Sequence, residues 1–111
     1  MTVNPVAFKG IYKITMPKAT EAKNEQEKGA YTDTITNVVV MGANNSIVPP
    51  KVDKNTSSIY FKIDDKNDTQ FETGFKNIIE DCNKRFNIDM AQKAYMEKVS
   101  EEEFQNAESL S

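Results

Sequence analysis

The chain has 111 residues, a net charge of −3 and 38% hydrophobic residues. This length fits a single domain with one modest core. The sequence contains no histidine, which excludes Ser-His-Asp, Cys-His and histidine-ligated zinc sites built within one chain.

Composition also indicates a location and a source. The one cysteine cannot form an internal disulfide. No segment approaches the ~18 consecutive apolar residues that a membrane span needs, and the first residues lack the charged start and apolar run of a signal peptide. We therefore expect a cytoplasmic protein without a membrane partner. The strong preference for Lys, with Arg85 as the single arginine, and the abundance of Asn indicate an AT-rich bacterial or phage genome.

The first third of the chain predicts a strand and a loop. Residues 6–16 alternate between apolar side chains of one parity and Lys or Thr of the other, which indicates a half-buried strand that Pro17 ends. Residues 17–30 contain no large apolar side chain ahead of Tyr31, so we expect a mobile loop or a marginal exposed helix there.

The middle of the chain favours further strands. Residues 31–41 are rich in Thr and Val, which are typical of strands. Residues 47–52 contain two prolines and predict at most a short edge segment. The stretch "TSSIYFKID" predicts another strand, with Ile59, Phe61 and Ile63 facing the core.

From Asp68 the periodicity becomes helical. Asp68 is suited to cap the helix N-terminus, and one apolar stripe recurs at helical spacing through residue 86. Its members are Phe71, Phe75, Ile78, Ile79, Cys82 and Phe86. Gly74 lies beside this stripe, and we expect it to allow a close approach to the sheet.

Two further helical segments are predicted after the long helix. One runs from Asp89 to about Val99, with Ala91, Tyr95 and Val99 on its inner side. The other begins at "SEEEF", where Ser100 and Glu103 have the spacing of a capping box, although few apolar residues follow. The whole order predicts an α+β fold: a small antiparallel sheet of three to four strands, covered on one face by one long amphipathic helix, with a C-terminal helical region over residues 100–111.

The sequence offers little catalytic chemistry. Cys82 lies deep in its helix without a histidine partner, so we interpret it as a small buried hydrophobic residue. Asp64, Asp65, Asn67 and Asp68 suggest a carboxylate-based cation site, but the glycine and glutamate of a calcium loop are missing from their expected positions. No catalytic, cofactor-binding or metal-ligating residue is assigned.

Two features favour a protein partner. Residues 1–62 carry eight lysines and five acidic residues, whereas residues 63–111 carry six basic and twelve acidic residues. The outer face of the predicted sheet also gathers apolar side chains among lysines, which resembles the anatomy of an interface. This candidate face consists of Ile11, Val38, Tyr60, Lys9, Lys13 and Phe104.

The hypothesis is therefore a non-catalytic protein-interaction module that binds an unidentified protein or itself. A small enzyme that uses carboxylate, Tyr or Lys groups is the first alternative, and a cation-binding protein is the second. Nucleic acid is a poor candidate because the net charge is negative.

Overall fold

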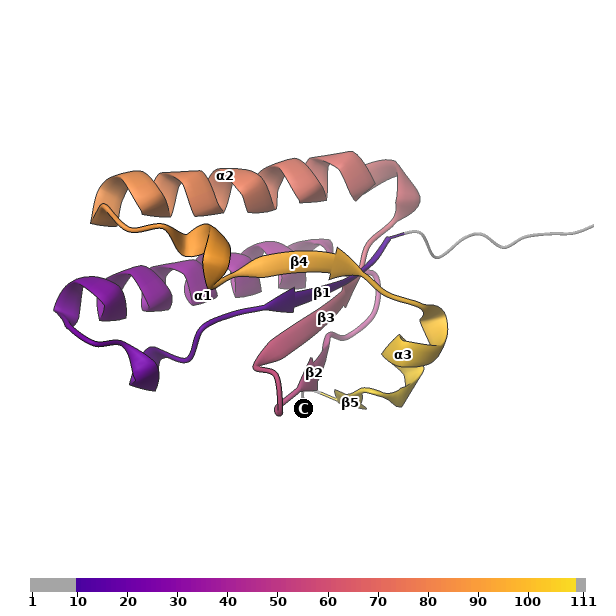
Figure 1. Ribbon diagram of the computed structural model, residues 1–111. Helices are drawn as coiled ribbons and strands as arrows, with labels where there is room; N and C mark the ends of the chain where they lie inside the picture. The colour runs from indigo at the N-terminus through magenta and orange to yellow at the C-terminus, as the bar shows by residue number, and fades with distance from the viewer. Residues whose placement is uncertain (1–9, 110–111) are drawn as a thin grey trace, which may run out of the picture.

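The computed structural model describes residues 10–109, which form an α+β fold with two long helices on one face of an antiparallel sheet (Figure 1). The strands run in the spatial order β4-β1-β3-β2-β5. Their bounds are Ile11–Thr15 (β1), Lys51–Asp53 (β2), Ser58–Lys62 (β3), Tyr95–Lys98 (β4) and Glu108–Ser109 (β5). The helices are α1 (Glu25–Asn45), α2 (Asp68–Phe86) and α3 (Glu101–Asn106), with short 3₁₀ turns at Ala19–Glu21, Asp65–Asn67 and Met90–Gln92.

The predicted fold class is correct, but its details differ. Within residues 10–109 the sheet has five strands rather than three or four, and two long helices rather than one cover it. The expected alternation holds in β1 and β3: Tyr12, Ile14 and Phe61 face the helices, and Ile11 and Tyr60 face the other side. The main core therefore lies between the sheet and the pair α1 and α2.

The strand predicted over residues 31–41 is wrong, because this segment belongs to α1. The helix already begins at Glu25, within the predicted loop, where the Asn24 side chain accepts a hydrogen bond of 2.8 Å from the amide of Glu27. Its buried positions follow the helical period: Ala30, Tyr31, Thr34, Val38 and Gly42. Burial against the sheet and α2 therefore outweighs the local β preference of Thr and Val.

Val38 consequently does not lie on the outer sheet face. It is fully buried in the main core, on the side of the sheet opposite to Ile11 and Tyr60. The sequence placed Val38 on the outer sheet face only because residues 31–41 were predicted to be a strand.

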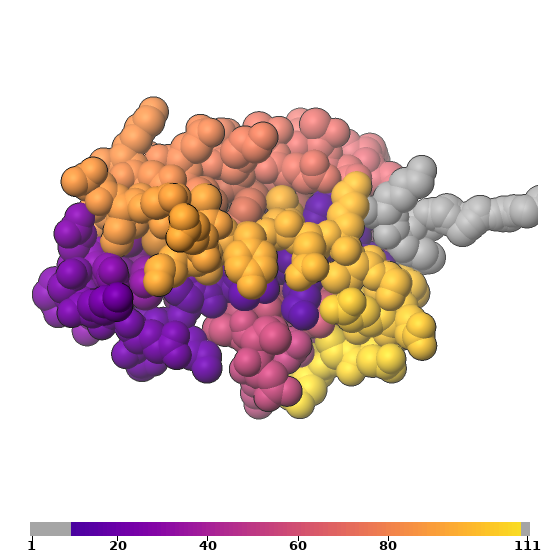
Figure 2. Space-filling model, in the orientation of Figure 1, coloured from indigo at the N-terminus to yellow at the C-terminus, as the bar shows by residue number. Residues whose placement is uncertain are grey.

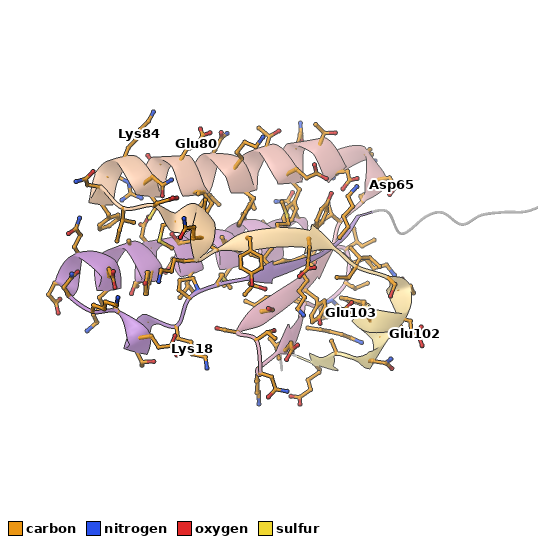
Figure 3. The ribbon with its side chains drawn as sticks, in the orientation of Figure 1. Lys18, Asp65, Glu80, Lys84, Glu102 and Glu103 are labelled. Atoms are coloured by element: carbon orange, nitrogen blue, oxygen red, sulfur yellow. The ribbon has the colours of Figure 1, made fainter. Side chains whose placement is uncertain are left out.

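The apolar stripe of α2 packs as the periodicity indicates. Phe71, Phe75, Ile79 and Cys82 are buried, and Ile78 and Phe86 are partly buried against the same core. Glu80 and Lys84 lie on the solvent side of this helix (Figure 3). Asn87, in the left-handed conformation with φ of 54°, ends the helix.

The helix predicted from Asp89 to Val99 is also wrong. Residues Met90–Gln92 form one 3₁₀ turn, and the chain then extends as β4 along β1. Ala91 and Tyr95 are exposed, so the four-residue spacing of Ala91, Tyr95 and Val99 does not mark a shared inner face. By contrast, α3 begins where predicted, with the Ser100 side chain accepting from the amide of Glu103 at 3.1 Å. The predicted helical region is too long, however, because α3 ends at Asn106 and the chain then pairs with β2 as β5. No helix within residues 10–109 has the length and apolar character to cross a membrane.

Two glycines set how closely the helices approach their neighbours. A Cβ atom on Gly42 would clash with the ring of Phe61, so the missing side chain lets α1 rest directly on β3. A Cβ atom on Gly74 would lie 2.8 Å from the sulfur of Met41. The close approach at Gly74 is therefore to α1, not to the sheet as the sequence suggested.

These contacts predict opposite outcomes for two similar substitutions. Gly42→Ala should lower the free energy of unfolding by about 1–3 kcal/mol, because the ring of Phe61 is buried and has no room to move. Gly74→Ala should leave stability unchanged or raise it by up to ~1 kcal/mol, because a flexible methionine end yields and alanine favours the helix. Urea denaturation of both variants checks this, and a stable Gly42→Ala variant would contradict the placement of α1.

Candidate interaction site

The outer face of the sheet brings together most of the residues that the sequence singled out. Ile11 on β1 and Tyr60 on β3 lie diagonally across the same face of the sheet, and Phe104 of α3 completes their buried cluster. The rings of Tyr60 and Phe104 meet edge to face with centroids 6.4 Å apart. All three side chains are buried, so the chain's own C-terminal segment covers the apolar part of this face.

A polar cluster surrounds this small second core. Lys13 Nζ lies 3.6 Å from Asp53 Oδ2 and 3.7 Å from Glu103 Oε2, and the hydroxyl of Tyr60 donates to Glu103 at 3.0 Å. Figure 3 shows Glu103 on the sheet side of α3 and Glu102 on its outer side. Together these groups line an open pocket of about 450 Å³ between the sheet and α3. Lys9 lies outside the described residues.

Ion pairs also join the oppositely charged halves of the sequence. Lys13 pairs with Glu103, and Lys62 Nζ lies 3.0 Å from Glu101 Oε1. Some of the opposite charges of the two halves thus pair within the chain, and these pairs hold α3 on the sheet.

On the opposite side of the sheet, Tyr12 anchors the start of α2. Its hydroxyl donates to Asp68 and, at 2.5 Å, to Glu72, and Lys98 Nζ lies 3.5 and 3.6 Å from the same two carboxylates. Asp68 therefore binds across to the sheet. The capping role predicted for it is wrong, because the N-cap position of α2 is Asn67 and Asp68 is the first residue of the helix.

The pKa values of Tyr12, Tyr60 and Lys13 are all raised, so these three side chains keep their protons. Burial, followed by hydrogen bonds to Asp68 and Glu72, raises the pKa of Tyr12. Burial and Glu103 likewise raise the pKa of Tyr60. Burial alone would lower the pKa of Lys13, but its interactions with Tyr60, Glu103 and Asp53 outweigh this effect and raise it.

The surroundings of Cys82 also disfavour the ionised form of its side chain. Its thiol is buried between α1 and α2, where the Thr34 hydroxyl donates to Sγ at 3.2 Å and Sγ faces the carbonyl of Ala30 at 3.4 Å. Burial raises the pKa of this thiol, and the Thr34 hydroxyl opposes the increase only in part. A higher thiol pKa means less thiolate and a slower nucleophile at neutral pH.

The acidic stretch at residues 64–68 does not converge on a cation position. Asp64 accepts from the amide of Lys66 at 3.1 Å, whereas Asp68 faces Tyr12 and Lys98. Within residues 10–109 no group of three or more His, Cys, Asp or Glu side chains is arranged to hold a metal ion.

The sequence did not reveal the open edge of the sheet at β4. Lys13 and Glu97 are paired across β1 and β4, and the amide of Val99 donates to the carbonyl of Ile11 at 3.0 Å. Because backbone groups alternate in direction along a strand, the amides of Met96 and Lys98 face away from β1. No other strand of residues 10–109 lies on that side of β4, and Figure 2 shows β4 at the surface below α2.

An apolar groove runs beside this edge. It has a volume of about 560 Å³ and lies between β4 and α2, with Phe75, Ile79, Ala94 and Met96 among its lining residues. Tyr95 is 49% exposed on the other face of β4. An unpaired strand edge next to apolar side chains is the arrangement to which extended chains add in β-augmentation.

Comparison with known proteins gives no relative: no family model, no curated protein and no solved structure matches the chain.

Cys82 should react slowly in the folded protein. We expect a thiol reagent at neutral pH to label Cys82 at least ~100-fold more slowly in native protein than in denaturant, because the thiol is buried and its pKa is raised. The variant Lys98→Cys, which carries a second thiol at an exposed position, should gain one fast-reacting group. Rapid labelling of Cys82 itself would restore the possibility of an activated thiol.

Tyr12 should make stability depend on pH in the alkaline range. A raised native pKa means that the folded state holds the phenol proton more tightly, so its contribution is complete below pH ~10 and decreases as the pH rises above that value. The Tyr12→Phe variant should lose about 1.5–3 kcal/mol at neutral pH, since two carboxylates lose a donor. Its stability should then decline less steeply than that of the wild type between pH ~9.5 and ~11 in urea melts. Equal slopes would show that the phenol is not held by Asp68 and Glu72.

Proposed function

We propose that this chain is an intracellular protein-interaction module without catalytic activity of its own, and that β4 is its docking edge. The observation that carries the proposal is the outward-facing backbone of Met96 and Lys98 beside the apolar groove under α2. A strand added there gains main-chain hydrogen bonds, and its alternate side chains enter the groove.

Docking through the outer sheet face, which the sequence indicated, is supported less well. Phe104 already covers Ile11 and Tyr60, and Lys13 is paired with Asp53 and Glu103. A partner at this face would have to displace α3 and break these ion pairs. The edge at β4 requires no such displacement.

A small enzyme remains the second candidate because Lys13, Tyr60 and Glu103 converge on the pocket beside α3. The pKa directions favour the interaction module, however. A nucleophilic lysine or a basic tyrosine needs a lowered pKa, whereas those of Lys13 and Tyr60 are raised. The same groups fit a structural role as the polar rim of the second core.

The proposal can be tested by affinity purification from the native cell with three baits. The wild-type chain and Val40→Lys, a change at a 53% exposed position on α1, should retain the same proteins. Met96→Pro should lose them, because proline removes an outward amide without breaking a bond to β1. Circular dichroism checks that each bait is folded. Retention of the same proteins by Met96→Pro would exclude β4 as the docking edge.

A further inference from the structure

We propose that the partner at β4 is a second copy of this chain, joined by antiparallel pairing of β4 with β4 about a two-fold axis at Met96. This inference rests on the proposed docking edge. It adds which chain binds there and which residues of the two strands lie opposite each other. Residues 10–109 of the two copies then form one continuous ten-stranded sheet. Both helix-covered faces lie on the same side of it, because the axis is perpendicular to the sheet.

The symmetry of an antiparallel homodimer leaves few registers to compare. Each register is defined by the residue at the axis, since that residue meets its own copy. An axis at Glu97 sets two glutamates directly opposite each other, and an axis at Lys98 does the same with two lysines. Like charges in direct cross-strand contact are destabilising. An axis at Tyr95 pairs most of β4 with residues 92–94, which are not extended.

An axis at Met96 avoids these conflicts. Met96 meets Met96, and Tyr95 lies opposite Glu97 on each side of the axis, so all three pairs stay within the four-residue strand. The outward amide and carbonyl of Met96 then exchange two hydrogen bonds with those of the other copy.

The side chains of β4 also suit this pairing. Met96 lies on the helix side, partly buried against the main core, and it lines the groove with Phe75 and Ile79. Two such methionines at the axis extend the apolar layer from one groove into the next, and methionine adapts readily to such a gap. The half-exposed Tyr95 gains a neighbour on the opposite face.

The charges on β4 restrict what else can dock. Edge strands of native proteins avoid indiscriminate pairing by being short and by carrying charged side chains. Glu97 and Lys98 serve this role here, because they penalise the neighbouring symmetric registers. A short edge that excludes wrong pairings and still has one compatible self-pairing favours a specific homodimer.

Disulfide cross-linking tests the register directly. In a Cys82→Ala background, Met96→Cys should form a linked dimer rapidly under mild oxidation, because directly opposite Cα atoms lie ~5.5 Å apart. The matched controls Glu97→Cys and Lys98→Cys should link at least ~10-fold more slowly, since their Cα atoms are offset by two and four residues along the strand and exceed the ~7 Å limit for a disulfide. Fastest linking by either control would overturn the proposed register, and slow linking by all three would overturn the dimer.

Sedimentation of the unmodified chain provides an independent measurement. Wild-type protein and Val40→Lys should shift from monomer toward dimer between ~1 and ~100 μM, the range in which a small interface associates. Met96→Lys should raise the dissociation constant at least ~10-fold, because it sets two lysines at the axis. Urea melts of this variant separate a broken interface from a broken fold.

The two proposals fail in different ways. A wild-type chain that stays monomeric at ~100 μM overturns the second-copy inference. If the native-cell purification nevertheless loses proteins with the Met96→Pro bait, β4 remains a docking edge for another chain. If that bait loses nothing, the docking edge itself is overturned.

Discussion

The inward side chains of β1 and β3 can be buried only if a helical layer lies close against them, and the rest of the structure follows from this requirement. Tyr12, Ile14 and Phe61 point to one side of the sheet and form the main core with α1 and α2. The close approach depends on Gly42, which leaves space for the ring of Phe61. Because α1 rests on the middle of the sheet, α2 occupies the side nearer β4, where Tyr12 binds its first turn.

The two sides of the sheet are covered unequally. Twenty-one residues of α1 and nineteen of α2 cover one face, whereas the six residues of α3 cover only part of the other. That small cover is held by one buried phenylalanine and by ion pairs to Lys13 and Lys62. The C-terminal segment therefore covers the apolar patch that the sequence suggested for a partner. What stays open within residues 10–109 is the edge of the sheet at β4.

Whether a helix could be predicted from the sequence depended on the size of its buried side chains. The stripe of α2 contains large apolar side chains at helical spacing, so its position was predicted well. The inner positions of α1 include Ala30, Thr34 and Gly42, which are small or polar, and the Thr and Val residues around them favour strands. The useful signal was the Asn24–Glu27 pair, which has the spacing of an N-terminal cap. Within the candidate interaction face, Ile11, Tyr60 and Phe104 do meet. The strand β4 was not predicted, because only its pairing with β1, eighty or more residues earlier, makes it a strand.

The pairing pattern of β1 also has a kinetic consequence. β1 is the first strand of residues 10–109, yet both of its neighbours come later: β3 at residues 58–62 and β4 at residues 95–98. On a ribosome, β1 has no strand partner from the described part of the chain until β3 emerges, and β4 can join only after both long helices have been made. Contacts so distant in sequence form slowly, because a long loop must close before they stabilise the chain. The β2–β3 hairpin, which closes over a few residues, is the natural starting point. The strand that completes the sheet's edge is therefore among the last elements to form during folding.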